Sequence, residues 1–148
     1  TFGDLLDGDL KVAPAFQFLL YPWVDMSGES DSIRRFAKGL ILTEETMTFF
    51  RDAYLPKEME PQAIKTSPIL CEDMSATPNT LMVTAEYDVL RDEGLAFVDK
   101  LQQAQVSVSH LHLPDCTHGF ISTGKFSPAT RKRLKQVAAM FDTYATNL

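Results

Sequence analysis

Three short apolar segments predict β-strands along the chain. Residues 15–21 form a nearly continuous apolar run that ends at Pro22, and its brevity and aromatic content favour a buried strand over a helix. Residues 80–84 form a second run of this kind. Residues 106–113 instead alternate between two faces, which is typical of a strand near the edge of a sheet.

Helical spacing of apolar residues follows the second and the third predicted strand. Residues 92–104 predict a helix between these two strands. A strand, a helix and a strand in this order form a βαβ unit, so the two strands should be parallel and joined by a right-handed connection. A last helix is predicted from Ser127 and Pro128, because a capping residue followed by proline is typical of a helix start. The predicted fold class is therefore α/β.

The stretch from residue 25 to residue 67 interrupts this alternation. It contains a predicted helix from about Glu44 to Tyr54, with Met47, Phe50 and Tyr54 on one side. About 40 residues between two buried strands are too many for a plain crossover, and long excursions of this kind are often lids or binding loops.

Composition and charge exclude several classes of protein. The 148 residues contain 45% hydrophobic and 23% charged residues, which is ordinary for a globular protein. The net charge of −6 and the lack of a basic cluster beyond residues 131–133 argue against nucleic acid and anionic membrane surfaces as partners. No apolar run approaches the roughly 18 residues that span a bilayer. Cys71 and Cys116 are too few for a disulfide framework and lack zinc-ligand spacing, which favours thiols in a reducing compartment such as the cytoplasm.

Polar residues that can carry chemistry follow two of the predicted strands directly. Residues 86–94 come after the second strand and residues 114–120 after the third. Ligands of open parallel sheets bind beyond the carboxyl ends of the strands, and both loops leave the sheet at that end. Asp88 and His118 can therefore meet. A carboxylate that accepts the Nδ1 proton of an imidazole leaves Nε2 as a general base for a hydroxyl nucleophile.

Each of these residues also has a simpler explanation. Asp88 can cap the following helix, and His118 can be a loop residue before a turn glycine. Asp115 is a rival acid in the same short loop as His118, and Cys116 is a rival nucleophile with nothing nearby that lowers its pKa. Four further residues are interpreted as strand histidines or as first-turn partners of a helix dipole: His110, His112, Asp92 and Glu93.

Four motifs of the chain form a recognisable set. They are Leu20-Tyr21-Pro22 with Asp25, Ser67-Pro68-Ile69-Leu70, the run from Thr84 to Gly94, and His118-Gly119-Phe120. Together they resemble the carboxyl-terminal half of an esterase of the hormone-sensitive-lipase-like family, which has the α/β-hydrolase fold. The resemblance extends from about residue 13 to the end of the chain. It implies that Asp88 is the acid and His118 the base of a catalytic triad, and that no metal or organic cofactor takes part.

The family's nucleophile is not found among these motifs. The family also has a His-Gly-Gly-Gly oxyanion loop and a Gly-Asp-Ser-Ala-Gly elbow, both amino-terminal to the strand at residues 15–21, which agrees with the triad order Ser, Asp, His in this fold. The sequence contains no Gly-x-Ser-x-Gly. The resemblance therefore implies that Thr1 is a cut edge and that residues 1–6 end the helix after the missing elbow.

The resemblance also predicts a division of the chain. Residues 1–24 and 68–148 would form a partial hydrolase core, and residues 25–67 would contribute a helical cap over the acyl pocket. Three residues of the cap helix would line that pocket: Met47, Phe50 and Tyr54. The alternative is that this apolar stripe packs onto the sheet.

The sequence thus supports two hypotheses of function. The first is a carboxylesterase for short- or medium-chain acyl esters, of which this chain carries the acid and the base and is inactive alone. The second is a non-catalytic, hydrolase-like binding module, against which the presence of both Asp88 and His118 argues. Expected partners are a small ester, the missing amino-terminal half and a second copy that pairs with the exposed apolar edge of the strand at residues 15–21.

Overall fold

A three-stranded parallel sheet is the centre of the computed structural model, which describes residues 14–55, 60–124 and 126–146. The strands are β1 (Gln17–Leu20), β2 (Thr80–Tyr87) and β3 (Val108–Thr117), in the order β1-β2-β3. Both neighbouring pairs are parallel. The three predicted strands, the parallel pairing of the last two and the α/β class are confirmed.

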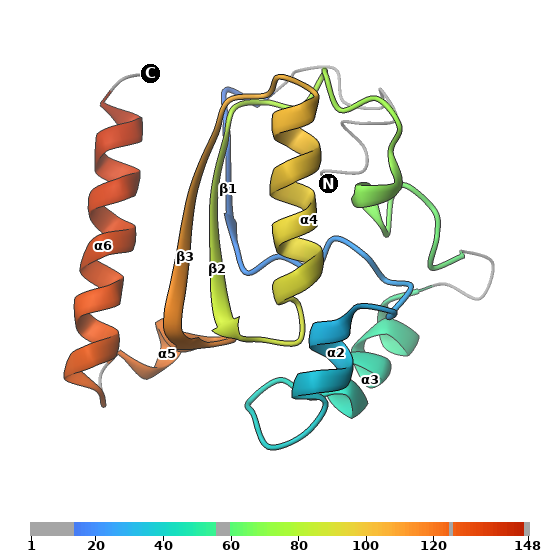
Figure 1. Cartoon of the computed structure of the whole chain (residues 1–148), viewed down its shortest axis with the longest axis horizontal. Coiled ribbons are helices and arrows are strands. Elements are labelled where there is room, and N and C mark those ends of the chain that lie inside the picture. Colours follow the sequence, from blue (N-terminus) through green and yellow to red (C-terminus); the bar gives the residue numbers. More distant parts are fainter. Residues whose placement is uncertain (1–13, 56–59, 125, 147–148) are drawn as a thin grey trace.

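Helices cover both faces of this sheet (Figure 1). Helix α4 (Arg91–Gln103) lies on one face and α6 (Pro128–Ala145) on the other. Successive residues of β2 point to opposite faces, so Met82 packs in a cluster with Phe97 of α4 and Val83 in a cluster with Val137 of α6. Because all of residues 80–85 are buried, β2 is the fully covered strand that its apolar run predicts.

Local capping explains where the predicted helices begin. The Ser127 side chain accepts a hydrogen bond from the Thr130 amide at the start of α6. The side chain of Thr43 does the same for Thr46 in α3 (Glu44–Tyr54), which confirms the helix expected there. Three short elements were not predicted, since few residues show no periodicity: α2 (Asp31–Phe36), the 3₁₀ turn η1 (Pro68–Leu70) and α5 (Phe120–Thr123).

Helices α2 and α3 lie at the end of the sheet to which the strands run (Figure 1). Met47 of α3 is buried in a cluster that also contains Ile33, Phe36, Val89 and Leu90. These partners belong to α2 and to the turn after β2, so the stripe of α3 does not pack onto a face of the sheet. A cap formed by residues 25–67 stays a prediction.

The predicted helix end at residues 1–6 lies outside the described residues. In the part of the chain that the structure describes, no helix is both long and apolar enough to cross a membrane.

Candidate active site

Asp88 and His118 follow neighbouring strands at the same end of the sheet. Asp88 comes directly after Tyr87, the last residue of β2, and His118 directly after Thr117, the last residue of β3. The register of the two strands shifts between Ala85 and Tyr87, after which Tyr87 lies opposite Thr117. Parallel pairing therefore brings the acid and the imidazole side by side, although 30 positions separate them in the sequence.

One hydrogen bond joins the two side chains. Nδ1 of His118 lies 2.8 Å from Oδ2 of Asp88, and Oδ1 of Asp88 accepts a hydrogen bond of 2.9 Å from the Leu90 amide. Asp88 is only 1% exposed, so both carboxylate oxygens are satisfied inside the protein. An ionised carboxylate can only accept, so a proton on Nδ1 of His118 completes this hydrogen bond and leaves Nε2 to act as an acceptor. Asp88 thus contacts His118 and also holds the turn before α4.

An apolar pocket of about 270 Å³ opens beside the imidazole. This volume is near the lower end of the roughly 300–1,000 Å³ typical of small-molecule sites. The lining residues come from β1 and the turn after it, from the insertion and from the two loops: Leu20, Tyr21, Trp23, Leu42, Met47, Phe50, Leu90 and His118. Met47 and Phe50 are among these lining residues, and their contact with a substrate stays a prediction. Tyr54 is not part of this lining and is 59% exposed.

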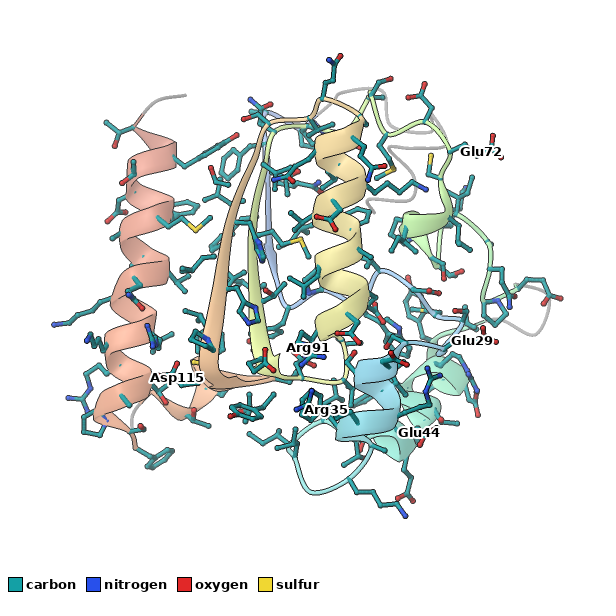
Figure 2. The ribbon with its side chains drawn as sticks, in the orientation of Figure 1. Glu29, Arg35, Glu44, Glu72, Arg91 and Asp115 are labelled. Carbon is teal, nitrogen blue, oxygen red and sulfur yellow. The ribbon has the colours of Figure 1, made fainter. Side chains whose placement is uncertain are left out.

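The rival residues after β3 are engaged elsewhere. Arg133 of α6 donates to both carboxylate oxygens of Asp115, over 2.8 and 2.9 Å, and this pairing lowers the pKa of Asp115. Figure 2 shows Asp115 toward α6, on the side of the sheet opposite Arg91. Burial raises the pKa of Cys116 to about 11, so its thiol stays protonated at neutral pH and is a poor nucleophile. Both cysteines are free and buried.

The two histidines of β3 belong to a separate polar network. Oγ1 of Thr84 lies 2.8 Å from Nε2 of His110 and 2.9 Å from Nδ1 of His112, whose Nε2 lies 3.2 Å from Glu86. Burial and the neighbouring His112 lower the pKa of His110. Among the described residues, no cluster of three or more His, Cys, Asp or Glu side chains is arranged to hold a metal ion.

The acidic residues at the start of α4 do more than face a helix dipole. Oδ2 of Asp92 accepts a hydrogen bond of 2.7 Å from the amide of Ser32 in α2. Oε1 of Glu93 accepts hydrogen bonds from the amides of Val24 (2.7 Å) and Asp25 (3.0 Å), just after β1. Burial raises the pKa of Glu93 to about 8. Sequence reasoning missed these links because their partners are backbone amides 60 or more positions away.

Tyr21 lies beside His118, although sequence reasoning gave this residue no role beyond its place in a motif. Its ring centroid lies 4.5 Å from that of His118, and the same ring lies 5.7 Å from Phe120. Burial and the charge of Asp88 raise the pKa of the Tyr21 hydroxyl. The Tyr-Pro pair that ends the first apolar run is the only signal of this position in the sequence.

The parallel sheet, covered on both faces, and the Asp–His pair beyond its strand ends define a class of α/β hydrolases. A family model described as the alpha/beta hydrolase fold matches residues 5–122. The chain belongs to this family. The resemblance seen in its motifs is thereby confirmed.

Individual relatives are esterases. The chain is 34% identical over 110 residues to the carboxylic ester hydrolase LipN of Mycobacterium tuberculosis and 33% identical over 112 residues to an ethyl acetate hydrolase of Pseudomonas putida. These matches cover 74% and 76% of this chain but 29% and 35% of the relatives. A solved ester hydrolase from the metagenome of Lake Arreo matches 95% of this chain with a TM-score of 0.86 and 35% identity. The match covers 44% of that structure. The chain therefore spans less than half the length of these proteins.

Proposed function

We propose that this chain supplies the acid and the base of a serine-type carboxylic ester hydrolase. The observation that carries the proposal is the 2.8 Å contact between Nδ1 of His118 and buried Asp88, beside an apolar pocket. His118 would take the proton of an attacking serine hydroxyl on Nε2 as the new C–O bond forms. It would then give this proton to the leaving alkoxide as the ester C–O bond breaks. Water would next attack the acyl-enzyme and give its proton to His118, which would return it to the serine oxygen as the carboxylic acid leaves. Asp88 would orient the ring and stabilise the imidazolium.

The proposal assigns the nucleophile and the oxyanion donors to residues outside these 148. The absence of Gly-x-Ser-x-Gly from the sequence supports this, as does the greater length of the relatives. The chain alone would then have no esterase activity. Among the described residues β1 pairs only with β2, so its other edge is open to the remaining strands of the fold or to a second copy.

The pocket supports short- or medium-chain acyl esters as substrates. Most of its lining side chains are aliphatic or aromatic, and Met47 and Phe50 of α3 would contact the acyl group. Residues 25–67 would form the cap that carries these two side chains. A contact of Tyr54 with the substrate stays a prediction, as does a cytoplasmic location.

The test compares two histidine variants of the whole gene product on p-nitrophenyl butyrate. His118→Gln should lower kcat by at least about a thousandfold, because the general base is lost. His112→Gln is the matched control, since this histidine lies in β3, the strand that leads to His118, but bonds to Thr84 and Glu86 and not to Asp88. Its turnover should stay close to that of the unchanged protein. Equal turnover by His118→Gln and the unchanged protein would refute the assignment.

Covalent labelling tests the origin of the nucleophile. A fluorophosphonate should label one serine of the whole gene product, within a segment that is not part of these 148 residues. A label on Cys116 or on a serine within them would contradict the proposal. Ligand binding without any label or ester turnover would instead favour the non-catalytic binding module.

A further inference from the structure

Tyr21 adopts a backbone conformation that its neighbours in the sequence disfavour. Its φ of 38° lies in the left-handed region, which is unfavourable for an L-residue with a side chain. Pro22 follows, and a residue before proline is restricted further, toward extended conformations. Surrounding contacts must hold such a strained residue in place, and strained residues concentrate at functional sites.

The chain turns after β1 at residues 21–25, and this turn directs the Tyr21 side chain toward His118. The Tyr21 amide donates a hydrogen bond of 2.7 Å to the Val83 carbonyl, so the pairing of β1 with β2 continues one residue beyond Leu20. The chain then leaves the strand direction. The Tyr21 ring lies 4.5 Å from the imidazole with 57° between the two planes, and it also meets Phe120 edge-on at 5.7 Å.

Buried Glu93 holds the last residues of this turn, Val24 and Asp25, by hydrogen bonds. Its Oε1 accepts from the amides of Val24 and Asp25, and Nε1 of Trp23 donates to the Asp25 carbonyl over 2.6 Å. Glu93 is 5% exposed, and its Oε2 has no partner in the described part of the chain. Since Glu93 lies in the first turn of α4, the strained turn is tied to the same helix start that follows Asp88.

His118 has few other constraints. Among the described residues, its one hydrogen-bonding side chain is Asp88, and Gly119 follows it with a φ of 70°. A single hydrogen bond at Nδ1 leaves an imidazole free to pivot about that contact, which would move Nε2. A misplacement of about 1 Å at a reacting atom can lower a rate by roughly a hundredfold.

We propose that Tyr21 is a positioning residue for His118, a role that rests on the proposed esterase function. The strained turn presents the aromatic ring as a wall against the imidazole, which limits its pivoting and keeps Nε2 directed at the pocket. The ring performs this task, and the phenolic hydroxyl does not take part. Aromatic contacts of this kind stabilise a side chain beyond the effect of their buried area, which biases it toward one orientation.

The test separates the ring from the hydroxyl in the whole gene product. Tyr21→Leu removes the ring and should lower kcat about 10- to 100-fold while KM changes less than about threefold. Tyr21→Phe keeps the ring and should retain turnover within about twofold. The downfield proton NMR signal of the His118 Nδ1–H should broaden or vanish in Tyr21→Leu and persist in Tyr21→Phe. Tyr144→Leu is the control, because Tyr144 of α6 makes a comparable ring contact with Phe16, the residue before β1.

Several outcomes would overturn the proposal. They are unchanged kcat and NMR signal in Tyr21→Leu, a change in KM alone, or equal losses in Tyr21→Phe, which would assign the role to the hydroxyl. If Tyr21→Leu does not fold, Tyr21→Met replaces it, since the thioether fills similar space without a ring. The NMR comparison needs no turnover. If His118→Gln left turnover intact, the proposed function would fail and the signal would still decide whether Tyr21 positions His118.

Discussion

Residues 86–94, which run from the end of β2 into the start of α4, lie at the same end of the sheet as helix α3, but the two regions are held in different ways. In residues 86–94 the charged side chains bond to one another, to His118 or to backbone amides. Arg91 donates to Glu86 (2.7 Å) and to Asp92 (2.8 Å), and Asp88 accepts from His118 and from a backbone amide. Gly94 adds close packing, because a Cβ there would lie 3.1 Å from the Thr84 methyl group.

Helix α3 presents apolar side chains to solvent instead. Met47 is its one buried residue, whereas Phe49, Phe50 and Tyr54 are 66%, 52% and 59% exposed. Aromatic side chains exposed in this way are suited to contact an apolar ligand or another part of the protein.

This contrast suggests that the two regions have different roles in the proposed function. The proposed proton transfer would require atoms fixed within a few tenths of an ångström, and residues 86–94, with nearly all of their polar groups satisfied, would provide this. The proposed acyl pocket would need only apolar area of suitable shape, which a helix with few buried residues can provide. Changes in residues 86–94 should therefore affect chemistry or stability, and changes in α3 should affect the choice of substrate.

Asp88→Asn should give the largest effect. An amide at this position can donate to Nδ1 and stabilise the wrong tautomer, so kcat should fall by about 10⁴-fold with little change in KM. Asp115→Asn is the control, since Asp115 bonds Arg133 on the other side of the sheet. Steady-state kinetics with p-nitrophenyl butyrate measure both. If the two variants lost similar activity, residues 86–94 would have no special role in the chemistry.

The sequence predicted the three strands, the longer helices and the meeting of Asp88 with His118, because these features depend on local patterns. Apolar runs and helical spacing depend on nearby residues, and the parallel order of two strands then places their following loops at one end. The 11 residues of α3 were long enough to show a helical pattern, whereas the six of α2 were not.

Glu93 and Tyr21 could not be predicted in the same way. The partners of Glu93 are backbone amides, which every residue except proline offers, so no residue type at Val24 or Asp25 signals the contact. The φ of Tyr21 contradicts the local preference of a residue before proline. Contacts distant in sequence decide both features, and sequence patterns do not encode them.

Glu93→Gln should change the pH dependence of stability. The pKa of Glu93 rises from 4.5 to about 8 on folding, chiefly by burial, and nearby Asp25 and Asp88 raise it further. Between these two pKa values the unfolded chain has released the proton and the folded chain retains it. The free energy of unfolding therefore falls as the pH rises from 4.5 through about 8. The variant lacks this contribution.

Urea unfolding of both proteins at about pH 5 and about pH 9 measures the effect. We compare the free energy of unfolding of the variant with that of the unchanged protein at each pH. This difference should shift by a few kcal/mol in favour of Glu93→Gln from about pH 5 to about pH 9, and a constant offset introduced by the amide does not affect the shift. Glu45→Gln is the control, because Glu45 is exposed on α3 and should show no such gain. Parallel pH profiles for Glu93→Gln and the unchanged protein would contradict a buried proton on Glu93.

Phe50→Ala should have the smallest effect and should alter selectivity alone. Phe50 lines the pocket while its neighbour Phe49 does not, so Phe49→Ala is a matched control on the same helix. Loss of a half-exposed ring removes about 1 kcal/mol of apolar contact with a long acyl chain. We expect kcat/KM for p-nitrophenyl octanoate to fall about fivefold while that for the acetate stays constant. The same measurement on Tyr54→Ala tests the predicted contact of Tyr54 with the substrate. A fall in kcat/KM for the octanoate like that of Phe50→Ala would support the contact, and a value like that of Phe49→Ala would contradict it.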